Sequence, residues 1–391
     1  MSIIEGKINI EMHLETASKP IVNISSSRPT QACKIFIGKT PEHVLSVVPL
    51  LFNICGVAQS RASLTAIQQC LDIQPLAQHE IARDILLLVE NAKEHLLRIG
   101  LDWPSLFAIQ HNSEQLPYIS QLNSIFEKEL FDGKAFQLDS TLNNDLSNVS
   151  ELIDSLDSYL ASDIFGSSAA TWCKDGSIKS YLDWAQTENN PAALATRYIH
   201  DHGWFPQGIS HCEQLPSLNA SELLKRFNGP NTRSFINSPQ WNATCYETTV
   251  LSRQLKHPLI ASLNDEFGLS LITRWTARLA ELSTIPSQLR LLLDALKATS
   301  ATLKTNPISD GIAQVEAARG LLVHRVEISN GSISQYQILA PTEWNFHTDG
   351  VITSCLENLN TDNKDHLEKL AHVVINAIDP CVGYSLRIHH A

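Results

Sequence analysis

The chain has 391 residues, of which 43% are hydrophobic and 18% charged, and its formal net charge at pH 7 is −12. This length and composition indicate a folded globular protein that can bury a sizeable core. The acidic balance argues against nucleic acid or an anionic membrane as a partner. No apolar run approaches the roughly 20 residues that cross a bilayer. The N-terminus shows no export signal, so we expect a cytoplasmic protein whose eight cysteines are mostly reduced.

The first part of the chain combines short strands with two helices. Apolar and polar residues alternate over 8–14, which predicts a half-buried strand, and extended segments are expected at 21–24 and 34–37. Thr40-Pro41 has the pattern of an N-cap followed by the first helical position.

A longer amphipathic helix is expected over 81–99, where apolar residues recur mostly at three- and four-residue steps, with Gly100 ending it. The polar stretch 139–147 is expected to be a loop between the two halves of the chain. The middle, 147–258, is irregular and supports few predictions.

The last third contains the clearest local signals. Residues 259–299 predict a helical hairpin, with Pro286 beginning its second helix. Asn330-Gly331 is the strongest two-residue turn signal and predicts a β-hairpin over 320–339. A final helix precedes Asp379. The whole pattern predicts a predominantly helical α+β fold, with small antiparallel elements near both ends.

Two cysteines in turns, Cys55 and Cys381, are the candidates for chemistry. Soft thiolates bind nickel, iron, copper or zinc, and two thiols from opposite ends of a chain can form part of such a site. A single cysteine in a glycine-containing turn is, however, more often an inert buried thiol. The residues alone leave both interpretations open.

Several segments together resemble the large subunit of nickel–iron hydrogenases. The family's amino-terminal signature, R-x-C-G-x-C-x-x-x-H, is similar to residues 53–62, and its carboxy-terminal signature, D-P-C-x-x-C-x-x-H, is similar to residues 379–387. Shorter matches lie in the same order between and before them: Glu5-Gly6, Leu101-Asp102-Trp103, Glu316 to Gly320 with His324, and Pro341 to Asn345. The resemblance implies a single large-subunit-like domain over 1–391 with a helical core.

The departures from the family pattern concern the metal ligands. In the family, four cysteines hold a nickel–iron pair, and the second cysteine of each signature bridges nickel to an iron that carries carbon monoxide and cyanide. This chain keeps the first positions, Cys55 and Cys381, but has Ala58 and Tyr384 at the bridging positions. The resemblance therefore implies that no hydrogen-splitting site forms, that nickel is not held, and that the chain is not an enzyme.

At the positions that surround the metal pair in the family, this chain matches the family pattern more closely. Arg319 matches the arginine that the family sets beside the cyanides, and Asp102 and Asp379 match acids that orient that arginine and the metal ligands. Glu5 matches the glutamate of the family's opening motif. Each could instead be an ordinary salt bridge or cap.

Loss of the bridging cysteines on a retained scaffold resembles the hydrogenase accessory proteins of the HupK type. This resemblance implies a non-catalytic scaffold in hydrogenase maturation, which transiently holds iron or an iron–dicyanide–carbonyl fragment. Its partners would be other maturation proteins and the hydrogenase large-subunit precursor. Two alternatives remain open: a residual nickel–iron hydrogenase or other redox enzyme, and a metal-free structural docking subunit.

A second, weaker metal candidate lies in the middle of the chain. His200, His202, His211 and Cys212 offer ligand types at close spacing. The chain has 15 histidines, so chance pairs of this kind are expected.

Overall fold

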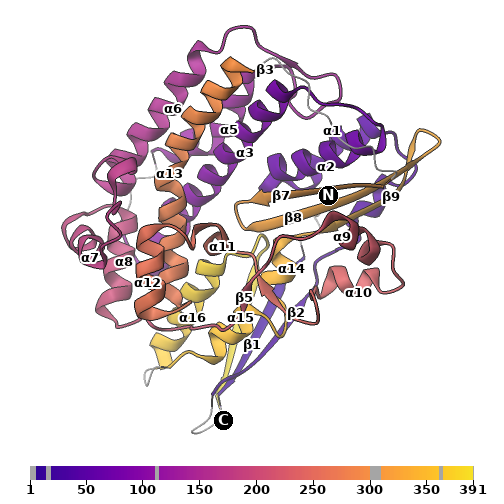
Figure 1. The fold of residues 1–391 in the computed structure, drawn as a ribbon. Coiled ribbons are helices and arrows are strands. Elements are labelled where there is room, and N and C mark those ends of the chain that lie inside the picture. Colours follow the sequence, from indigo (N-terminus) through magenta and orange to yellow (C-terminus); the bar gives the residue numbers. More distant parts are fainter. Residues whose placement is uncertain (1–5, 15–18, 111–113, 300–309, 361–363, 391) are drawn as a thin grey trace.

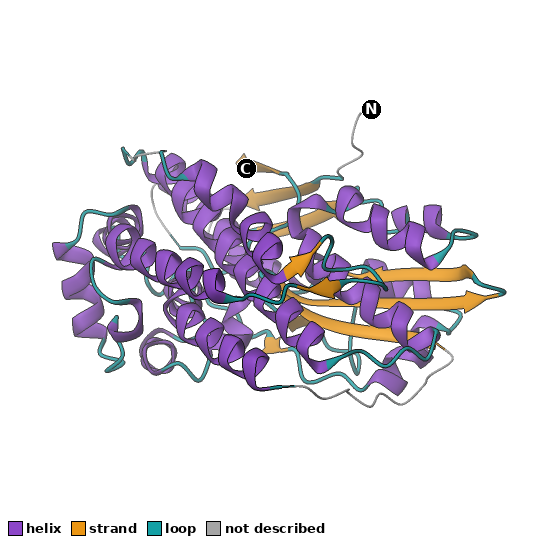
Figure 2. Ribbon diagram, turned by 90° about the horizontal axis from the view of Figure 1, so that it is seen from above, coloured by secondary structure: helices purple, strands orange, loops and turns teal. Residues whose placement is uncertain are grey.

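A computed structural model of the chain describes residues 6–14, 19–110, 114–299, 310–360 and 364–390. Helices dominate the fold, and two three-stranded sheets lie beside the helical body (Figures 1 and 2). The predicted fold class, predominantly helical with small sheets, is confirmed.

The helical body is built around two long helices, α3 and α13, which pack against each other; α5 packs against α3, and α6 packs against α13 (Figure 1). Its helices are α3 (Ala77–Leu97), α4 (Trp103–Phe107), α5 (Leu116–Leu130), α6 (Ser147–Tyr159), α7 (Ile178–Thr187), α8 (Pro191–Asp201), α11 (Val250–Gln254), α12 (Pro258–Phe267), α13 (Leu271–Ala298) and α16 (Lys364–Ile378).

Helix α13 corrects the prediction that Pro286 begins a second helix. The chain breaks earlier, between α12 and α13, and Pro286 lies inside a continuous 28-residue helix. Every residue from Leu271 to Ser283 is buried, so packing on all sides offsets the roughly 3 kcal/mol cost of an interior proline. Ser283 and Thr284 also donate their hydroxyls to carbonyls of the preceding turn.

The end of α3 differs from the prediction as well. Gly100 does not end the helix; it lies in a π-helical turn, Arg98–Asp102, that leads directly into α4. The apolar face continues past the glycine through Ile99 and Trp103, both fully buried. Ala108, with φ of 54°, ends the helical run instead.

The first sheet holds β7 (Asp310–Ala317), β8 (Gly320–Ser329) and β9 (Ser332–Leu339) in antiparallel order. Asn330 and Gly331 both have positive φ, which confirms the predicted hairpin turn. Strand β7 is not predicted because glycine, alanine and acidic residues weaken its strand signal. Helix α2 (Gly56–Cys70) packs against β7 and β8.

The second sheet joins the two ends of the chain. Strand β1 (Ile8–Leu14) pairs antiparallel with β2 (Ile21–Ser26) and parallel with β10 (Tyr384–His390). The strands at 8–14 and 21–24 are confirmed and pair antiparallel as expected, and the parallel pairing of β1 with β10 is an addition that was not predicted. The parallel partner comes from the far end of the chain, where local patterns carry no pairing signal.

The segment at 34–37 is helical over 34–36, and only Ile37 has extended backbone angles. It belongs to a 3-10 helix, η1 (Ala32–Phe36), in which Cys33 and Phe36 are buried three residues apart. Helix α1 (Pro41–Leu51) then begins as predicted, with Thr40 Oγ1 accepting from the His43 backbone N–H. A short 3-10 turn, η2 (Asn53–Cys55), connects α1 to α2.

Small elements complete the chain between these parts. The stretch 139–147 contains β4 (Thr141–Leu142) and the first residue of α6. The remaining elements are β3 (Phe131–Asp132), β4 (Thr141–Leu142), η4 (Leu160–Phe165), η5 (Ala169–Thr171), β5 (Glu213–Gln214), α9 (Ala220–Phe227), α10 (Thr232–Asn237), β6 (Tyr246–Glu247), α14 (Pro341–Asn345) and α15 (Val351–Glu357).

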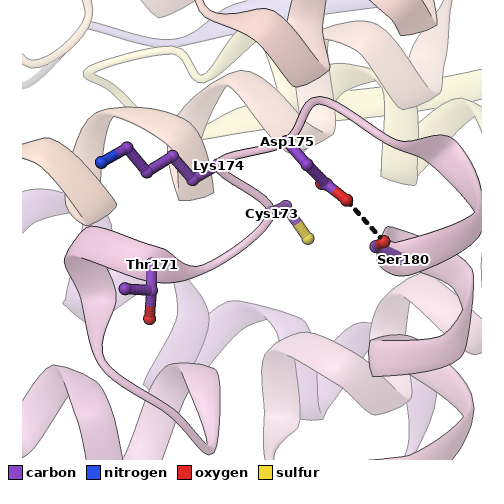
Figure 3. A pocket seen from close by; sticks show the side chains of 5 residues that line it. All are labelled: Thr171, Cys173, Lys174, Asp175 and Ser180. Atoms are coloured by element: carbon purple, nitrogen blue, oxygen red, sulfur yellow. Dashed lines mark hydrogen bonds between the residues drawn. The ribbon is translucent and has the colours of Figure 1, made fainter.

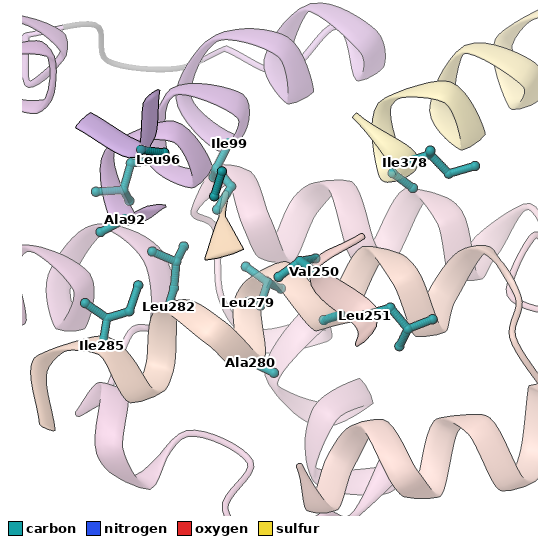
Figure 4. Packing of buried hydrophobic residues seen from close by; sticks show 14 of the residues in the cluster. Ala92, Leu96, Ile99, Val250, Leu251, Leu279, Ala280, Leu282, Ile285 and Ile378 are labelled. Atoms are coloured by element: carbon teal, nitrogen blue, oxygen red, sulfur yellow. The ribbon is translucent and has the colours of Figure 1, made fainter. Parts of the chain in front are cut away.

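The main hydrophobic cluster draws on both halves of the chain. Figure 4 shows one region of it, where Leu96 of α3, Leu251 of α11, Leu279 of α13 and Ile378 of α16 are buried. Within the described residues, no single helix is long and apolar enough to span a membrane. The helices Pro41–Leu51 and Asn53–Cys70 reach a sufficient length and apolar composition only when they are taken together, and the chain bends by 99° between them.

Candidate functional site

Cys55 and Cys381, the two predicted metal ligands, lie close enough for their thiols to interact electrostatically. Cys55 occupies the N-cap position of α2, at the sharp bend that follows α1. Cys381 lies in the turn between α16 and β10, where its Sγ is 2.7 Å from Thr342 Oγ1. The fold therefore brings the two thiols from opposite ends of the chain to one place.

The surroundings of Cys55 disfavour its use as a nucleophile. Burial raises the pKa of Cys55 to about 12, Cys381 and Glu90 add to the rise, and Arg319 opposes it. A thiol with so high a pKa is almost entirely protonated at neutral pH and reacts slowly. Metal ions bind the thiolate, so metal binding at this pair would release protons and would strengthen as the pH rises.

Arg319 lies beside both thiols, in the turn between β7 and β8. The side chain is buried; its Nε donates to Asp379 Oδ1 at 3.2 Å and its Nη2 to Glu94 Oε2 at 3.1 Å. Its Nη1 is buried without a hydrogen-bond partner among the described residues. Cys55 and Cys381 both act on the guanidinium electrostatically. A buried donor left unpaired is costly, so this nitrogen is suited to an acceptor that enters beside the thiols.

Asp379 anchors Arg319 and two further arginines at the end of α16. Its carboxylate forms an ion pair with Arg98 Nη2 at 2.8 Å, and it accepts hydrogen bonds from Arg278 Nη2 at 3.4 Å and from Arg319 Nε. Burial alone would raise the pKa of Asp379, but the three arginines outweigh it and hold that pKa well below 3.8. The backbone of Asp379 has φ of 67°, a conformation that turns the chain sharply before Cys381.

The other two predicted acids are placed differently. Asp102 Oδ2 accepts from Arg98 Nη1 and, at 3.3 Å, from Asn376 Nδ2, so its route to Arg319 runs through Arg98 and Asp379. Glu5 lies outside the described residues. The structure therefore places Asp379 directly against Arg319, whereas two residues, Arg98 and Asp379, lie between Asp102 and Arg319.

Ala58 and Tyr384, which the sequence resemblance matches to the bridging cysteines, are occupied with other partners. Ala58 is fully buried, and its backbone N–H and that of Val57 donate to Glu90 at 2.8 Å each. The Tyr384 hydroxyl lies 2.8 Å from His372 Nδ1. Neither a methyl group nor this engaged phenol offers a bridging sulfur, so the residues present do not fit a thiolate-bridged metal pair.

Sequence reasoning missed a second arginine near the thiols, Arg28. Its guanidinium forms an ion pair with Glu343, and Cys381 and Cys55 both act on it electrostatically. Arg28 and Arg319 together place two positive charges beside the thiol pair. Glu343 sits within a motif that was identified, but nothing local indicates that its partner lies 315 residues earlier.

Sequence reasoning also missed the carboxylates of α3. Glu90 and Glu94 are buried, and burial raises the pKa of Glu90 to about 7. The available signal was their spacing: Glu90, Asn91, Glu94 and His95 are polar at three- and four-residue steps, which can place them on one helix face. Such a stripe is usually solvated, whereas here it faces the candidate site.

The second metal candidate is not assembled. His200 Nδ1 pairs with Asp201 at 3.0 Å, and His202 Nδ1 contacts the Tyr198 carbonyl at 2.8 Å. Cys212 Sγ donates to the Cys245 carbonyl at 3.3 Å. In the part of the chain that the structure describes, these side chains do not form a three-ligand cluster.

An open hollow in the middle of the chain is separate from the thiol site. It is lined by Thr171, Cys173, Lys174, Asp175 and Ser180, with Ser180 Oγ donating to Asp175 at 2.9 Å (Figure 3). Burial raises the pKa of Cys173 to about 12, so this thiol is a poor nucleophile at neutral pH.

Comparison with known proteins extends these observations. The family model described as nickel-dependent hydrogenase matches residues 140–386. The chain is 24% identical to "Hydrogenase expression/formation protein HupK" of Azotobacter vinelandii, over 99% of both chains. It is 27% identical to "Hydrogenase expression/formation protein HoxV" of Cupriavidus necator, over 94% of this chain and 92% of that protein.

Solved structures of other proteins resemble this chain in fold. The nickel–iron–selenium hydrogenase of D. vulgaris Hildenborough, in its as-isolated oxidised state, superposes with a TM-score of 0.68 at 16% identity, over 94% of each chain. At this identity the likeness concerns the fold alone.

Proposed function

The chain belongs to the nickel-dependent hydrogenase family, and we propose that it is a non-catalytic member that serves in hydrogenase maturation. The two full-length relatives described above carry the words expression and formation in their names, which supports this role. Its partners would be other maturation proteins and the precursor of a hydrogenase large subunit.

The proposal rests above all on the thiol pair beside Arg319. Cys55 and Cys381, as thiolates, would hold iron or an iron–dicyanide–carbonyl fragment as cargo. Arg319 Nη1, a buried donor with no partner among the described residues, is suited to a cyanide nitrogen. Arg28 adds a second positive charge that favours an anionic fragment.

Two features favour transient holding over catalysis. With Ala58 and Tyr384 in place of two bridging thiols, the fragment would keep only two protein sulfur ligands and could leave more easily. The same loss leaves nickel without enough thiolates for a hydrogen-splitting pair, which argues against the alternative of a residual hydrogenase.

The surface beside Cys55 supports transfer to another protein. Leu50, Leu51 and Ile54 directly precede the thiol, and the Leu50 side chain is 77% exposed. A partner that covered these apolar side chains would lie next to the cargo. The same exposed residues also fit the alternative of a metal-free docking subunit, which would need this surface but not the thiols.

Infrared spectroscopy on protein purified without air separates these functions. The wild-type chain should show bands from iron-bound carbon monoxide and cyanide, and the double variant Cys55→Ser with Cys381→Ser should lose them. The control is Cys173→Ser with Cys245→Ser, which also removes two thiols but leaves the site intact. Cells that carry only the Cys55/Cys381 double variant should lack hydrogenase activity. Full activity in those cells would show that the holding function is wrong.

A further inference from the structure

The solvent-facing side of the β10–β1–β2 sheet carries a group of metal-ligating side chains that the thiol site does not use. Strands β1 and β10 run parallel, and His13 stands directly opposite His389. Glu11 lies two residues before His13 and therefore on the same face of β1. The opposite face of β1, with Ile8, Ile10 and Met12, is fully buried in the core.

These three side chains are close to one another. The imidazole rings of His13 and His389 stack with centroids 4.5 Å apart and planes 10° from parallel. Glu11 Oε2 is 3.9 Å from His13 Nε2. One ligand atom from each of the three residues lies within 4.8 Å of the other two.

The ligand types define the class of ion. Two imidazoles and one carboxylate suit zinc, nickel, cobalt or ferrous iron better than magnesium or calcium, which prefer all-oxygen sites. An ion about 2.0–2.2 Å from each ligand atom requires the three groups to draw together by roughly 1 Å. The nitrogen lone pairs lie in the ring planes, so the stacked rings of His13 and His389 must also tilt towards each other to reach one ion. Glu11 and His13 are each about 40% exposed at the side chain, which leaves room for this rotation. Solvent would complete the coordination.

We propose that Glu11, His13 and His389 form a binding site for a divalent transition-metal ion that ties the last strand of the chain to the first. Such an ion would affect the position of Cys381, because β10 begins only three residues after this cysteine. An ion held across β1 and β10 fixes the register of β10 and with it the turn that carries this thiol. The site lies on the outer face of the sheet and does not depend on the proposed cargo function.

Zinc binding to the full chain tests this site. The protein is stripped of metal and carries Cys55→Ser and Cys381→Ser, so that the thiol pair cannot contribute. In this background Zn²⁺ should bind with saturation, measured by calorimetry, and His13→Ala or His389→Ala should weaken binding on the order of 100-fold. His200→Ala, which removes a histidine from another exposed histidine–carboxylate pair, should leave the affinity unchanged.

Trypsin gives a second measurement that reports on the strand itself. Arg387 lies within β10, so cleavage after it requires β10 to leave the sheet. Zn²⁺ should slow this cut about tenfold in the starting protein and leave it unchanged in His13→Ala. Equal zinc affinity in the His13 variant, the His389 variant and the starting protein, or no saturable binding at micromolar zinc, would overturn the proposal.

Discussion

The guanidinium of Arg319 donates from Nε to Asp379 Oδ1 over 3.2 Å, and this contact ties the β7–β8 turn to the end of α16. The same carboxylate meets Arg98 and Arg278. Arginine stays charged at any pH that a folded protein survives, so Asp379 provides the negative charge on which three buried or half-buried cations depend. The carboxylates of Asp379 and Glu94 together hold Arg319 beside the thiols.

Replacement of Asp379 by asparagine should lower the free energy of unfolding by about 3–5 kcal/mol, because it leaves buried positive charge uncompensated. Urea denaturation at pH 7 measures the change. The control is Asp154→Asn, since Asp154 pairs with Arg290 on the surface and such pairs contribute about 0–1 kcal/mol. A cost for Asp379→Asn no greater than the control would mean that solvent compensates these arginines.

The Asp379 carboxylate should also make the free energy of unfolding depend on pH in the acid range. Because the pKa of Asp379 is lower in the folded chain than its ordinary 3.8, its stabilising contribution is fully present above about pH 4. The contribution is lost as the pH falls further through the depressed folded value. In Asp379→Asn, unfolding titrations should therefore show a weaker loss of stability below pH 4 than in the wild-type chain.

Glu90 should act in the opposite direction. Burial raises its pKa from 4.5 to about 7, so folding disfavours its charged form, and stability falls as the pH rises from 4.5 to 7. Between pH 5 and pH 8 this one residue should lower the free energy of unfolding by about 2–3 kcal/mol. Urea denaturation of Glu90→Gln should lack this part of the pH dependence, although the amide accepts poorly from two N–H groups. Glu42→Gln, at an exposed position in α1, should keep the wild-type dependence; an unchanged profile in Glu90→Gln would contradict the prediction.

Local patterns predicted those parts of the fold that are decided within a few residues. The Thr40 cap and the Asn330-Gly331 turn are of this kind, because side chain and backbone meet inside one turn. Pro286 and Gly100 were misjudged for the reverse reason. Burial contributed by distant helices outweighed the local preference of each to interrupt a helix.

In the candidate site too, local sequence identified some residues, whereas others could be found only from the fold. Cys55, Cys381, Arg319 and Asp379 could be named because each sits in a short motif. Their partners Arg28, Glu94, Arg98 and Arg278 come from separate elements, and only the fold shows that they converge. A buried glutamate on an amphipathic helix has the same local sequence signal as a solvated one.

The thiol of Cys55 should be nearly inert in the folded chain. With its pKa at about 12 rather than 9, about a thousandfold less thiolate is present at pH 8. Iodoacetamide labelling followed by mass spectrometry should therefore modify Cys55 slowly in buffer and at an ordinary rate in urea. Arg319→Gln should slow the reaction further, because Arg319 is the neighbouring charge that favours the thiolate. Equal rates in folded and unfolded chains would show that Cys55 is not held in this environment.

Gly320 should tolerate no side chain, because the backbone that positions Arg319 passes directly against another segment. A Cβ at Gly320 would lie 1.6 Å from the Thr248 carbonyl oxygen, and the residue has φ of 123°. Gly320→Ala should therefore cost about 4 kcal/mol or more, which is exceptional for a single substitution. Gly331→Ala is the matched control: its φ is 74° but its Cβ would meet open space, so only the backbone cost of about 1–2 kcal/mol applies. Urea denaturation of both variants measures the difference, and equal costs would mean that the β7–β8 turn yields to the added methyl group.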